Sequence, residues 1–214
     1  MRLVGHYDLS RKLSMMAGLS AHRRSALHEK AYDRLGMPST YTSAAPVVEV
    51  EYRPMGFGGP VLTLNYERSI KGLLGASMEY ERYEADGQYI WNISALQSLQ
   101  MRAGAGFYSH RGEDRFFLDY ELLNSNWYNS SQYYVRANIT YESPLMILAW
   151  IPWAGRFMEK ERIYVNALTV KDLHPYMEYG YGFATRLFST GIFVSQKNGK
   201  FDGIGFRFGV ELFR

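Results

Sequence analysis

Acidic and basic side chains recur at alternate positions along this chain, and their types could do acid–base chemistry. The acids are Glu49, Glu51, Glu67, Glu84, Asp86, Glu142, Glu178 and Glu211, and the arginines are Arg53, Arg68, Arg82, Arg102, Arg136, Arg162 and Arg207. Paired carboxylates can act as general acid and base. Here the arginines offer counter-charges on the same polar rows, and semi-buried charges need partners. We therefore expect a polar surface of ion pairs, or in its functional version a solute path that these charges select.

Histidine and serine give little support for catalysis. The five histidines are His6, His22, His28, His110 and His174. No two of them are four residues apart on a helix with a carboxylate, so a zinc-protease site is not predicted. Ser20 with His22 and Ser109 with His110 are candidate pairs for an acyl hydrolase, but adjacent strand residues point to opposite faces, which excludes the second pair. We expect no enzyme activity, no metal and no cofactor.

Composition favours a β protein. The 214 residues are 47% hydrophobic and 16% aromatic, with a mean hydropathy of −0.28, and aromatic residues favour strands and membrane interfaces. A helical membrane protein would be more apolar. The net charge of +3 is too small to indicate a nucleic-acid partner, and the absence of cysteine excludes disulfides and thiol chemistry. The length suits a single domain over residues 1–214.

The alternation is clearest between Tyr134 and Leu168, and it predicts strands whose two faces differ. The apolar positions there are Val135, Ala137, Ile139, Tyr141, Ile163, Val165 and Ala167, and the polar positions between them are Arg136, Asn138, Thr140, Glu142, Arg162, Tyr164 and Asn166. The same period of two recurs along most of the chain and gives about eleven strands. The last of them is about ten residues long, enough for a tilted strand to cross a bilayer.

Such alternation is typical of an antiparallel transmembrane β-barrel, with apolar rows toward lipid and polar rows toward a lumen. We expect longer polar loops at Arg23–Ala45 and His110–Gln132, on the outer side if the C-terminus lies in the periplasm. The residues predicted to line the lumen are Glu49, Glu51, Arg53, Glu67, Arg82, Glu84, Asp86, Arg102, Arg136, Glu142, Arg162, Glu178, Arg207 and Glu211. The predicted location is the outer membrane of a Gram-negative cell envelope.

An apolar insert, Pro144–Phe157, interrupts the pattern. It is shorter than the roughly twenty residues that a membrane-spanning helix needs, and Pro152 would interrupt a helix there. We expect a short helix at the periplasmic mouth of the barrel, or a docking patch for an assembly or secretion partner. Interface belts are predicted for the aromatic residues at strand ends, which are Tyr7, Trp91, Tyr108, Trp127, Tyr128, Trp150 and Trp153.

The first residues continue directly into strand-like sequence and lack the apolar core of a signal peptide. An outer-membrane barrel needs export, and an open sheet edge in lipid would leave unpaired backbone groups at several kcal/mol each. We therefore expect this sequence to be part of a larger barrel, closed by further strands or by a partner.

Four segments resemble a known family. They are 134–144 (YVRANITYESP), 161–166 (ERIYVN), 174–182 (HPYMEYGYG) and Leu62–Leu74 with its Tyr66-Glu67-Arg68 and Ile70-Lys71-Gly72. They look like the C-terminal region of a Bacteroidota outer-membrane family of unknown function that commonly follows a carboxypeptidase-regulatory-like β-domain. The resemblance implies a signal peptide, a small periplasmic β-sandwich and more barrel strands upstream, and it implies no catalytic residues. A departure is Arg214 after Phe213, where barrel chains usually end on an aromatic residue.

The leading interpretation is an integral outer-membrane barrel with a structural, transport or envelope-assembly role. Its expected partners are outer-membrane lipid and lipopolysaccharide, and the barrel-assembly machinery at the C-terminal strand. A soluble β-sandwich or lipocalin-like binding module is the main alternative, and it requires the apolar rows to converge on one interior. An outer-membrane acyl hydrolase is the third, and it requires a serine that faces the membrane.

Overall fold

The computed structural model describes residues 2–25, 40–56, 58–109, 116–118, 127–129, 132–152, 158–170 and 173–210. Over these ranges the secondary structure is β, apart from two single-turn 3-10 helices, η1 (Leu73–Gly75) and η2 (Leu148–Trp150). A search of the same ranges for a helix able to cross a membrane found none.

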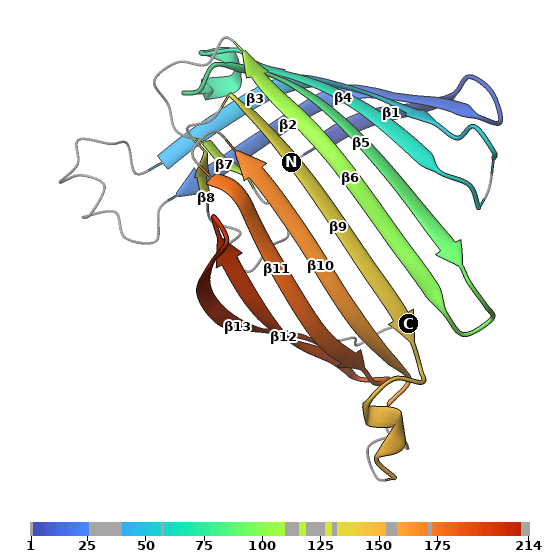
Figure 1. The fold of residues 1–214 in the computed structure, drawn as a ribbon. Coiled ribbons are helices and arrows are strands. Elements are labelled where there is room, and N and C mark those ends of the chain that lie inside the picture. The colour runs from blue at the N-terminus through green and yellow to red at the C-terminus, as the bar shows by residue number, and fades with distance from the viewer. Residues whose placement is uncertain are drawn as a thin grey trace. The chain divides into compact units, whose positions relative to one another are not determined.

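The strands follow one another mostly as antiparallel neighbours. They are β1 (Arg2–Asp8), β2 (Leu13–Ser25), β3 (Thr40–Tyr52), β4 (Val61–Ser69), β5 (Tyr80–Asn92), β6 (Ser98–Ser109), β7 (Phe116–Leu118), β8 (Trp127–Asn129), β9 (Tyr133–Ser143), β10 (Lys160–Val170), β11 (Leu173–Ala184), β12 (Phe188–Lys197) and β13 (Lys200–Val210). Eleven of them form a single sheet in the order β1–β6 and then β9–β13, while β7 and β8 pair separately (Figure 1). The predicted all-β antiparallel fold of about eleven strands is confirmed. Within the described ranges the sheet is not closed, because it ends at β1 and at β13.

The chain gathers into two compact units. The first comprises residues 1–57, 61–85 and 106–114, and the second comprises 58–60, 86–105 and 115–214, so β5 and β6 contribute to both. Buried apolar side chains are few in each. In the first unit they include Ala45, Val47, Tyr80 and Tyr108, and in the second Tyr134, Leu168, Tyr176, Ala184 and Phe193. The single-domain organisation of residues 1–214 stays a prediction.

Strand registers align the alternating rows of the second unit. From β9 to β13, one lateral row is Tyr141, Ile163, Tyr181, Ile192 and Phe206, and another is Ile139, Val165, Tyr179, Val194 and Ile204. Three further rows are Glu142, Arg162, Gly182, Gly191 and Arg207, then Thr140, Tyr164, Gly180, Phe193 and Gly205, then Asn138, Asn166, Glu178, Ser195 and Gly203. Because side chains alternate between the faces of a strand, the first two rows share one face, here called the apolar face, and the other three share the polar face.

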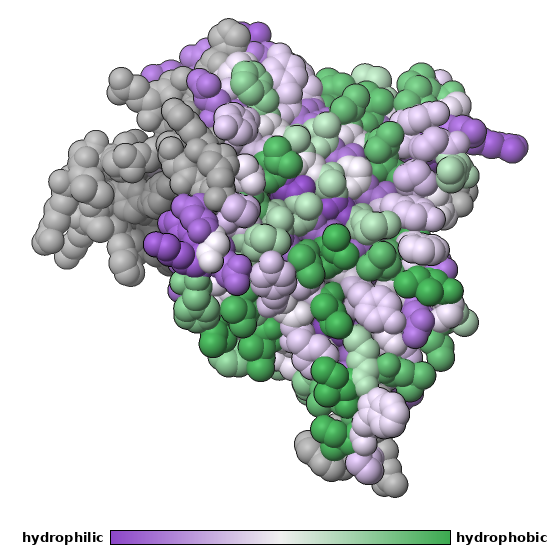
Figure 2. All heavy atoms as spheres, viewed as in Figure 1, coloured by the Kyte–Doolittle hydropathy of each residue, from purple (hydrophilic) through white to green (hydrophobic). Residues whose placement is uncertain are grey.

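Burial on the two faces is the reverse of that in a water-soluble sheet. On the apolar face Ile192 is 52% exposed and Phe206 is 74% exposed, whereas on the polar face Glu142 is 7% exposed and Glu178 is fully buried. Hydrophobic residues, green in Figure 2, accordingly lie on the molecular surface. The predicted alternation is confirmed, and its charged rows are the shielded ones.

The first unit repeats this pattern. Its registers place Tyr7, Met15, Val50 and Leu64 in one lateral row across β1–β4. The neighbouring rows on the other face are His6, Met16, Glu49 and Asn65, then Asp8, Ser14, Glu51 and Thr63. Leu64 is exposed, while Glu67, farther along the polar side of β4, is buried.

The turns and loops follow local sequence. Asn198 and Gly199 both have positive φ (51° and 75°), as the two-residue turn between β12 and β13 requires, and Asn-Gly is the preferred pair for such a turn. The predicted loop limits were wrong at the Arg23–Ala45 segment, because β2 continues to Ser25 and β3 begins at Thr40. The His110–Gln132 segment is likewise not all loop, since it contains the paired strands β7 and β8. Apart from Gln132, the remainder of both segments lies outside the described residues.

Candidate functional site

The polar face of the second unit carries a cluster centred on Glu142, at the end of β9. Lys160 Nζ and Arg162 Nε, both from β10, donate to its two carboxylate oxygens at 2.6 and 2.8 Å. The register places Arg162 directly opposite Glu142, so the salt bridge is a cross-strand pair. A buried carboxylate that receives two charge-assisted hydrogen bonds is held rigidly in one position.

A second cluster spans three strands and depends on a glycine. Arg136 Nη2 on β9 donates to both oxygens of Asp86 on β5, at 2.8 and 3.1 Å, and Arg102 Nε on β6 lies 3.2 Å from Asp86 Oδ1. β6 lies between β5 and β9 in the sheet. A Cβ added at Gly104 of β6 would be 2.5 Å from Asp86 Oδ1 and 3.2 Å from Arg136 Nε. Gly104 therefore leaves the space through which the ion pair crosses β6.

A third group surrounds Glu178 on β11. Tyr176 OH donates to it at 2.8 Å, and Asn166 Nδ2 from β10 lies 3.4 Å away. Asn138 Nδ2 donates in turn to Asn166 Oδ1 at 3.0 Å, which continues the hydrogen-bonded row to β9. Neutral donors thus contribute to holding this fully buried carboxylate.

The glycines of the polar face also make room for an aromatic side chain. Phe193 on β12 is buried and lies over Gly180 of β11, where an added Cβ would come within 2.4 Å of its ring. Tyr164 packs beside Phe193 in a tilted arrangement with ring centroids 5.2 Å apart, and the guanidinium carbon of Arg207 lies 4.7 Å from the Phe193 ring centroid. These contacts bring Tyr164, Phe193 and Arg207 together on the polar face.

Tyr164 and Arg207 border a concavity of about 240 Å³ on the polar face of the second unit. Its other lining residues are Gln88, Tyr89, Ile90, Gln100, Met101, Arg102, Asn138, Thr140 and Asn166. Two arginines and four side-chain amides thus border one hollow. Sequence analysis placed both arginines among the lumen residues and put Asn138 and Asn166 on the polar rows, but it named none of the four amides as a site residue. The alternation shows which face an amide is on, but not which other side chains will surround it.

In the first unit, Glu67 and Arg82, both predicted to line the lumen, form an ion pair. Arg82 Nη2 donates to Glu67 at 2.7 Å, Tyr80 OH donates to the same carboxylate, and Glu84 lies 3.8 Å from Arg82 Nε. Glu49 accepts from Arg2 at 3.3 Å and from Asn65 at 3.2 Å.

Arg53, the residue that follows β3, donates to Glu51 of β3 at 2.6 Å, at the rim of an open hollow beside the β1–β2 turn. Fourteen lumen residues were predicted, and the thirteen that are described all take part in such polar contacts or border the concavity. Glu211 lies outside the described residues.

One predicted counter-charge was wrong. Arg68 directly follows Glu67 in β4, so its side chain points to the opposite face, and it is exposed while Glu67 is buried. It therefore cannot belong to the polar row with Glu67.

Two buried carboxylates lie on the apolar side and were missed by sequence analysis. Glu81 on β5 accepts hydrogen bonds from Tyr66, Tyr83 and Ser109 at 2.6, 2.9 and 2.9 Å. Glu81 and the second acid, Glu161, each lie two residues before an apolar-row residue, Tyr83 and Ile163. The alternation could therefore have placed both acids on the apolar face.

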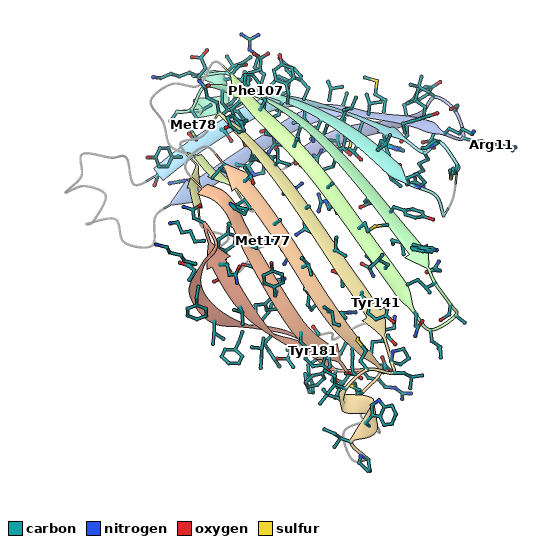
Figure 3. The ribbon with its side chains drawn as sticks, in the orientation of Figure 1. Arg11, Met78, Phe107, Tyr141, Met177 and Tyr181 are labelled. Carbon is teal, nitrogen blue, oxygen red and sulfur yellow. The ribbon has the colours of Figure 1, made fainter. Side chains whose placement is uncertain are left out.

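Glu161 is the more informative of the two, because it holds the apolar insert. Its carboxylate accepts from the backbone N–H groups of Met146, Ile147 and Leu148 at 3.0, 2.9 and 3.0 Å, and Tyr181 OH donates to it as well. The insert connects β9 to β10, and Tyr141 of β9 and Tyr181 of β11 lie near the end of these strands at which it projects (Figure 3). Glu161 is fully buried, and its carboxylate attaches the first residues of the insert to β10.

The insert exposes its apolar side chains. Leu145 and Ile147 are exposed, and Trp150 is 85% exposed. The predicted short helix is the single 3-10 turn η2, and residues 153–157, including Trp153, lie outside the described part. Of the predicted interface aromatics, Tyr7 and Trp91 are exposed too, but Tyr108 is buried against Tyr80, so its assignment to an interface belt was wrong. Trp127 and Tyr128 are placed only by the backbone pairing of β8.

The Ser20–His22 pair does form a hydrogen bond, with Oγ and Nε2 2.6 Å apart. Ser20 is 3% exposed and lies on the same face of β2 as Gly18 and Met16, opposite to the face of Met15. The acyl-hydrolase hypothesis needs a serine on the apolar face, whereas Ser20 is buried on the other face, so the geometry does not favour this hypothesis. In the described ranges no group of three or more His, Asp or Glu side chains is arranged to hold a metal ion. His28 and His110 lie outside those ranges.

A known family matches part of the chain. Residues 110–183 match the C-terminal domain of a family of unknown function, DUF5686. The matched range is about a third of the 214 residues and includes β9, β10 and nearly all of β11. Three of the four segments that suggested a family of unknown function lie inside it, and Leu62–Leu74 lies outside. The resemblance to a C-terminal domain of unknown function is thereby confirmed for this range. No curated protein matches the chain.

Proposed function

We propose that this chain forms part of an integral outer-membrane β-barrel whose apolar face meets lipid and whose polar face lines the lumen. The observation that supports it is the reversed burial of the sheet. Exposed rows such as Ile163, Ile192 and Phe206 alternate with buried charged rows such as Glu142 and Glu178. Each such large apolar side chain gains about 1.5–3 kcal/mol when it is moved from water into an apolar environment.

The open edges of the sheet set a condition on this proposal. β1 and β13 each have one side without a neighbouring strand in the described part of the chain. Unpaired backbone groups at an edge are tolerated in water but cost several kcal/mol each in lipid. The proposed barrel therefore closes with further strands, contributed by the same polypeptide or by another chain, and exceeds eleven strands.

The proposed partners follow from the faces and ends of the sheet. Lipid and lipopolysaccharide would contact the apolar rows. The barrel-assembly machinery would bind the C-terminal strand, β13. The insert 144–157 leaves the same end of the second unit at which β13 finishes, so a periplasmic C-terminus makes it periplasmic as well. Its exposed Trp150 suits a membrane interface or a periplasmic partner.

The role of the barrel is structural, or it serves transport or envelope assembly, and we propose no enzymatic activity. The carboxylates of Glu142 and Asp86, which could serve in acid–base catalysis, are instead held in salt bridges with arginines. A soluble β-sandwich or lipocalin-like module would need a second layer over the apolar rows.

The test uses the full-length gene product with its native upstream region, expressed and fractionated. The expected result is recovery in the detergent-insoluble outer-membrane fraction with heat-modifiable migration on a gel, because folded barrels resist unfolding in detergent without heating. Recovery as a soluble monomer without detergent would contradict the proposal and favour the binding module.

A further inference from the structure

The concavity on the polar face has the size and lining of a small-solute site. Its volume of about 240 Å³ is close to the lower end of ligand pockets, and its walls come from β5, β6, β9, β10 and β13. Several side chains that line these walls are held in place by the contacts described above. Asn138 and Asn166 are joined by a hydrogen bond, and Tyr164 is packed against Phe193. A preformed polar hollow binds a solute with less loss of side-chain freedom than a mobile one.

The charge of the lining is positive. Arg102 and Arg207 border the hollow, and no acidic side chain does. Asp86, which does not border the hollow, forms ion pairs with both Arg102 and Arg136. The Arg102 side chain is 37% exposed and Arg207 is also exposed, so a solute can reach both.

The uncharged lining indicates what else the solute carries. Four amides (Gln88, Gln100, Asn138 and Asn166) and the hydroxyls of Thr140 and Tyr164 can donate and accept hydrogen bonds. The ring of Tyr164 offers an apolar surface beside them. This combination suits a small ring with many hydroxyl groups, and guanidinium groups suit a carboxylate.

We propose that this concavity binds a monosaccharide-sized, hydroxyl-rich carboxylate such as a uronic acid. The inference rests on the proposed function in one respect. If the polar face lines the lumen of a barrel, the concavity would be a selective site on a solute path. The carboxylate lies against Arg102 and Arg207, and the hydroxyl groups lie against the amides.

The test compares binding of D-glucuronate and D-glucose to the purified full-length protein by isothermal titration calorimetry, in detergent or in plain buffer according to how the protein is recovered. The expected result is at least about tenfold tighter binding of glucuronate, the usual gain from a charge-assisted hydrogen bond. The double variant R102Q/R207Q should lose that preference. R186Q is the matched control, because Arg186 is 88% exposed and pairs with Glu159 away from the concavity.

Equal affinity for the two sugars, or no binding of glucuronate by the unaltered protein, would overturn the proposal without any variant having to fold. Full retention of the preference in the double variant would overturn it as well. These outcomes are separate from failure of the barrel proposal, which is read from fractionation and heat-modifiable migration. A soluble protein that prefers glucuronate would keep the site and refute the barrel.

Discussion

Glu142 and Glu161 are both buried, at the same end of the β9–β10 pair, but on opposite faces of it. Glu142 belongs to the polar face and is held by Lys160 and Arg162. Glu161 belongs to the apolar face and is held by Tyr181 and by three backbone N–H groups of the insert. The comparison shows two ways of shielding a carboxylate, by cations in a charged row and by a folded-back backbone in an apolar one.

The difference also explains why the insert sits where it does. A bare carboxylate beside exposed Ile163 would be costly to desolvate in an apolar environment. The backbone N–H groups of Met146, Ile147 and Leu148 remove that cost and are themselves satisfied. Glu161 thus fixes the insert to the sheet, while Leu145, Ile147 and Trp150 remain exposed.

The largest expected effect comes from placing a charge on the apolar face. Replacing Ile192 by Arg should destabilise the membrane-inserted protein by about 2–4 kcal/mol, the cost of a cation on the lipid face of a barrel. Denaturant titration in lipid vesicles measures this change in the free energy of unfolding.

The matched control is Gln100→Arg, an exposed polar-face position in the same unit, where the change should stay below about 1 kcal/mol. If Ile192→Arg is as mild as this control, the apolar face meets water and the contrast between the faces has no membrane origin.

Glu161→Gln should be the next most severe change, with a loss of about 2–3 kcal/mol. The amide keeps the shape of the side chain, but its NH₂ group faces backbone N–H donors and leaves them without an acceptor. The insert should also loosen, which limited chymotrypsin cleavage after Leu145 or Trp150 would detect. Glu159→Gln serves as the control, since Glu159 pairs with the exposed Arg186 and should contribute under about 0.5 kcal/mol. Unchanged cleavage in Glu161→Gln would refute the anchoring role.

Much of the fold and of the polar face could be predicted from the sequence, because a period of two fixes which residues share a face. The rows of Glu142, Arg162 and Arg207 follow from that rule and the register. Arg68 was misplaced by a single position, which on a strand reverses the face. Glu161 could not be predicted, because its partners are backbone groups of an insert whose fold has no periodic signal. The ends of β2 and β3 were missed because polar residues such as Ser25 and Thr40 continue strands without apolar alternation.

Glycine on the polar face gives an intermediate effect that tests the packing of Phe193. Gly180→Ala should cost about 2 kcal/mol, since the new Cβ would lie 2.4 Å from the Phe193 ring and force it to move. Gly203→Ala is the control, on the same face, where the nearest atom to an added Cβ is Ser195 Oγ at 3.8 Å. The two variants should therefore differ clearly in unfolding free energy. Similar values would show that Phe193 does not occupy the space above Gly180.

The smallest effects separate the two cations of the Glu142 cluster. Arg162→Met should cost about 1–2 kcal/mol, because its side chain is 20% exposed and its hydrogen bond is shielded from water. Lys160→Met should cost less than about 1 kcal/mol, because the Lys160 side chain is 41% exposed, and its effect should shrink further in molar salt. The double variant should exceed the sum of the two, since Glu142 then loses both salt-bridge partners while staying buried. A strictly additive double variant would mean that Glu142 becomes hydrated when its cations are removed, and that the polar face is open to water at this end of β9.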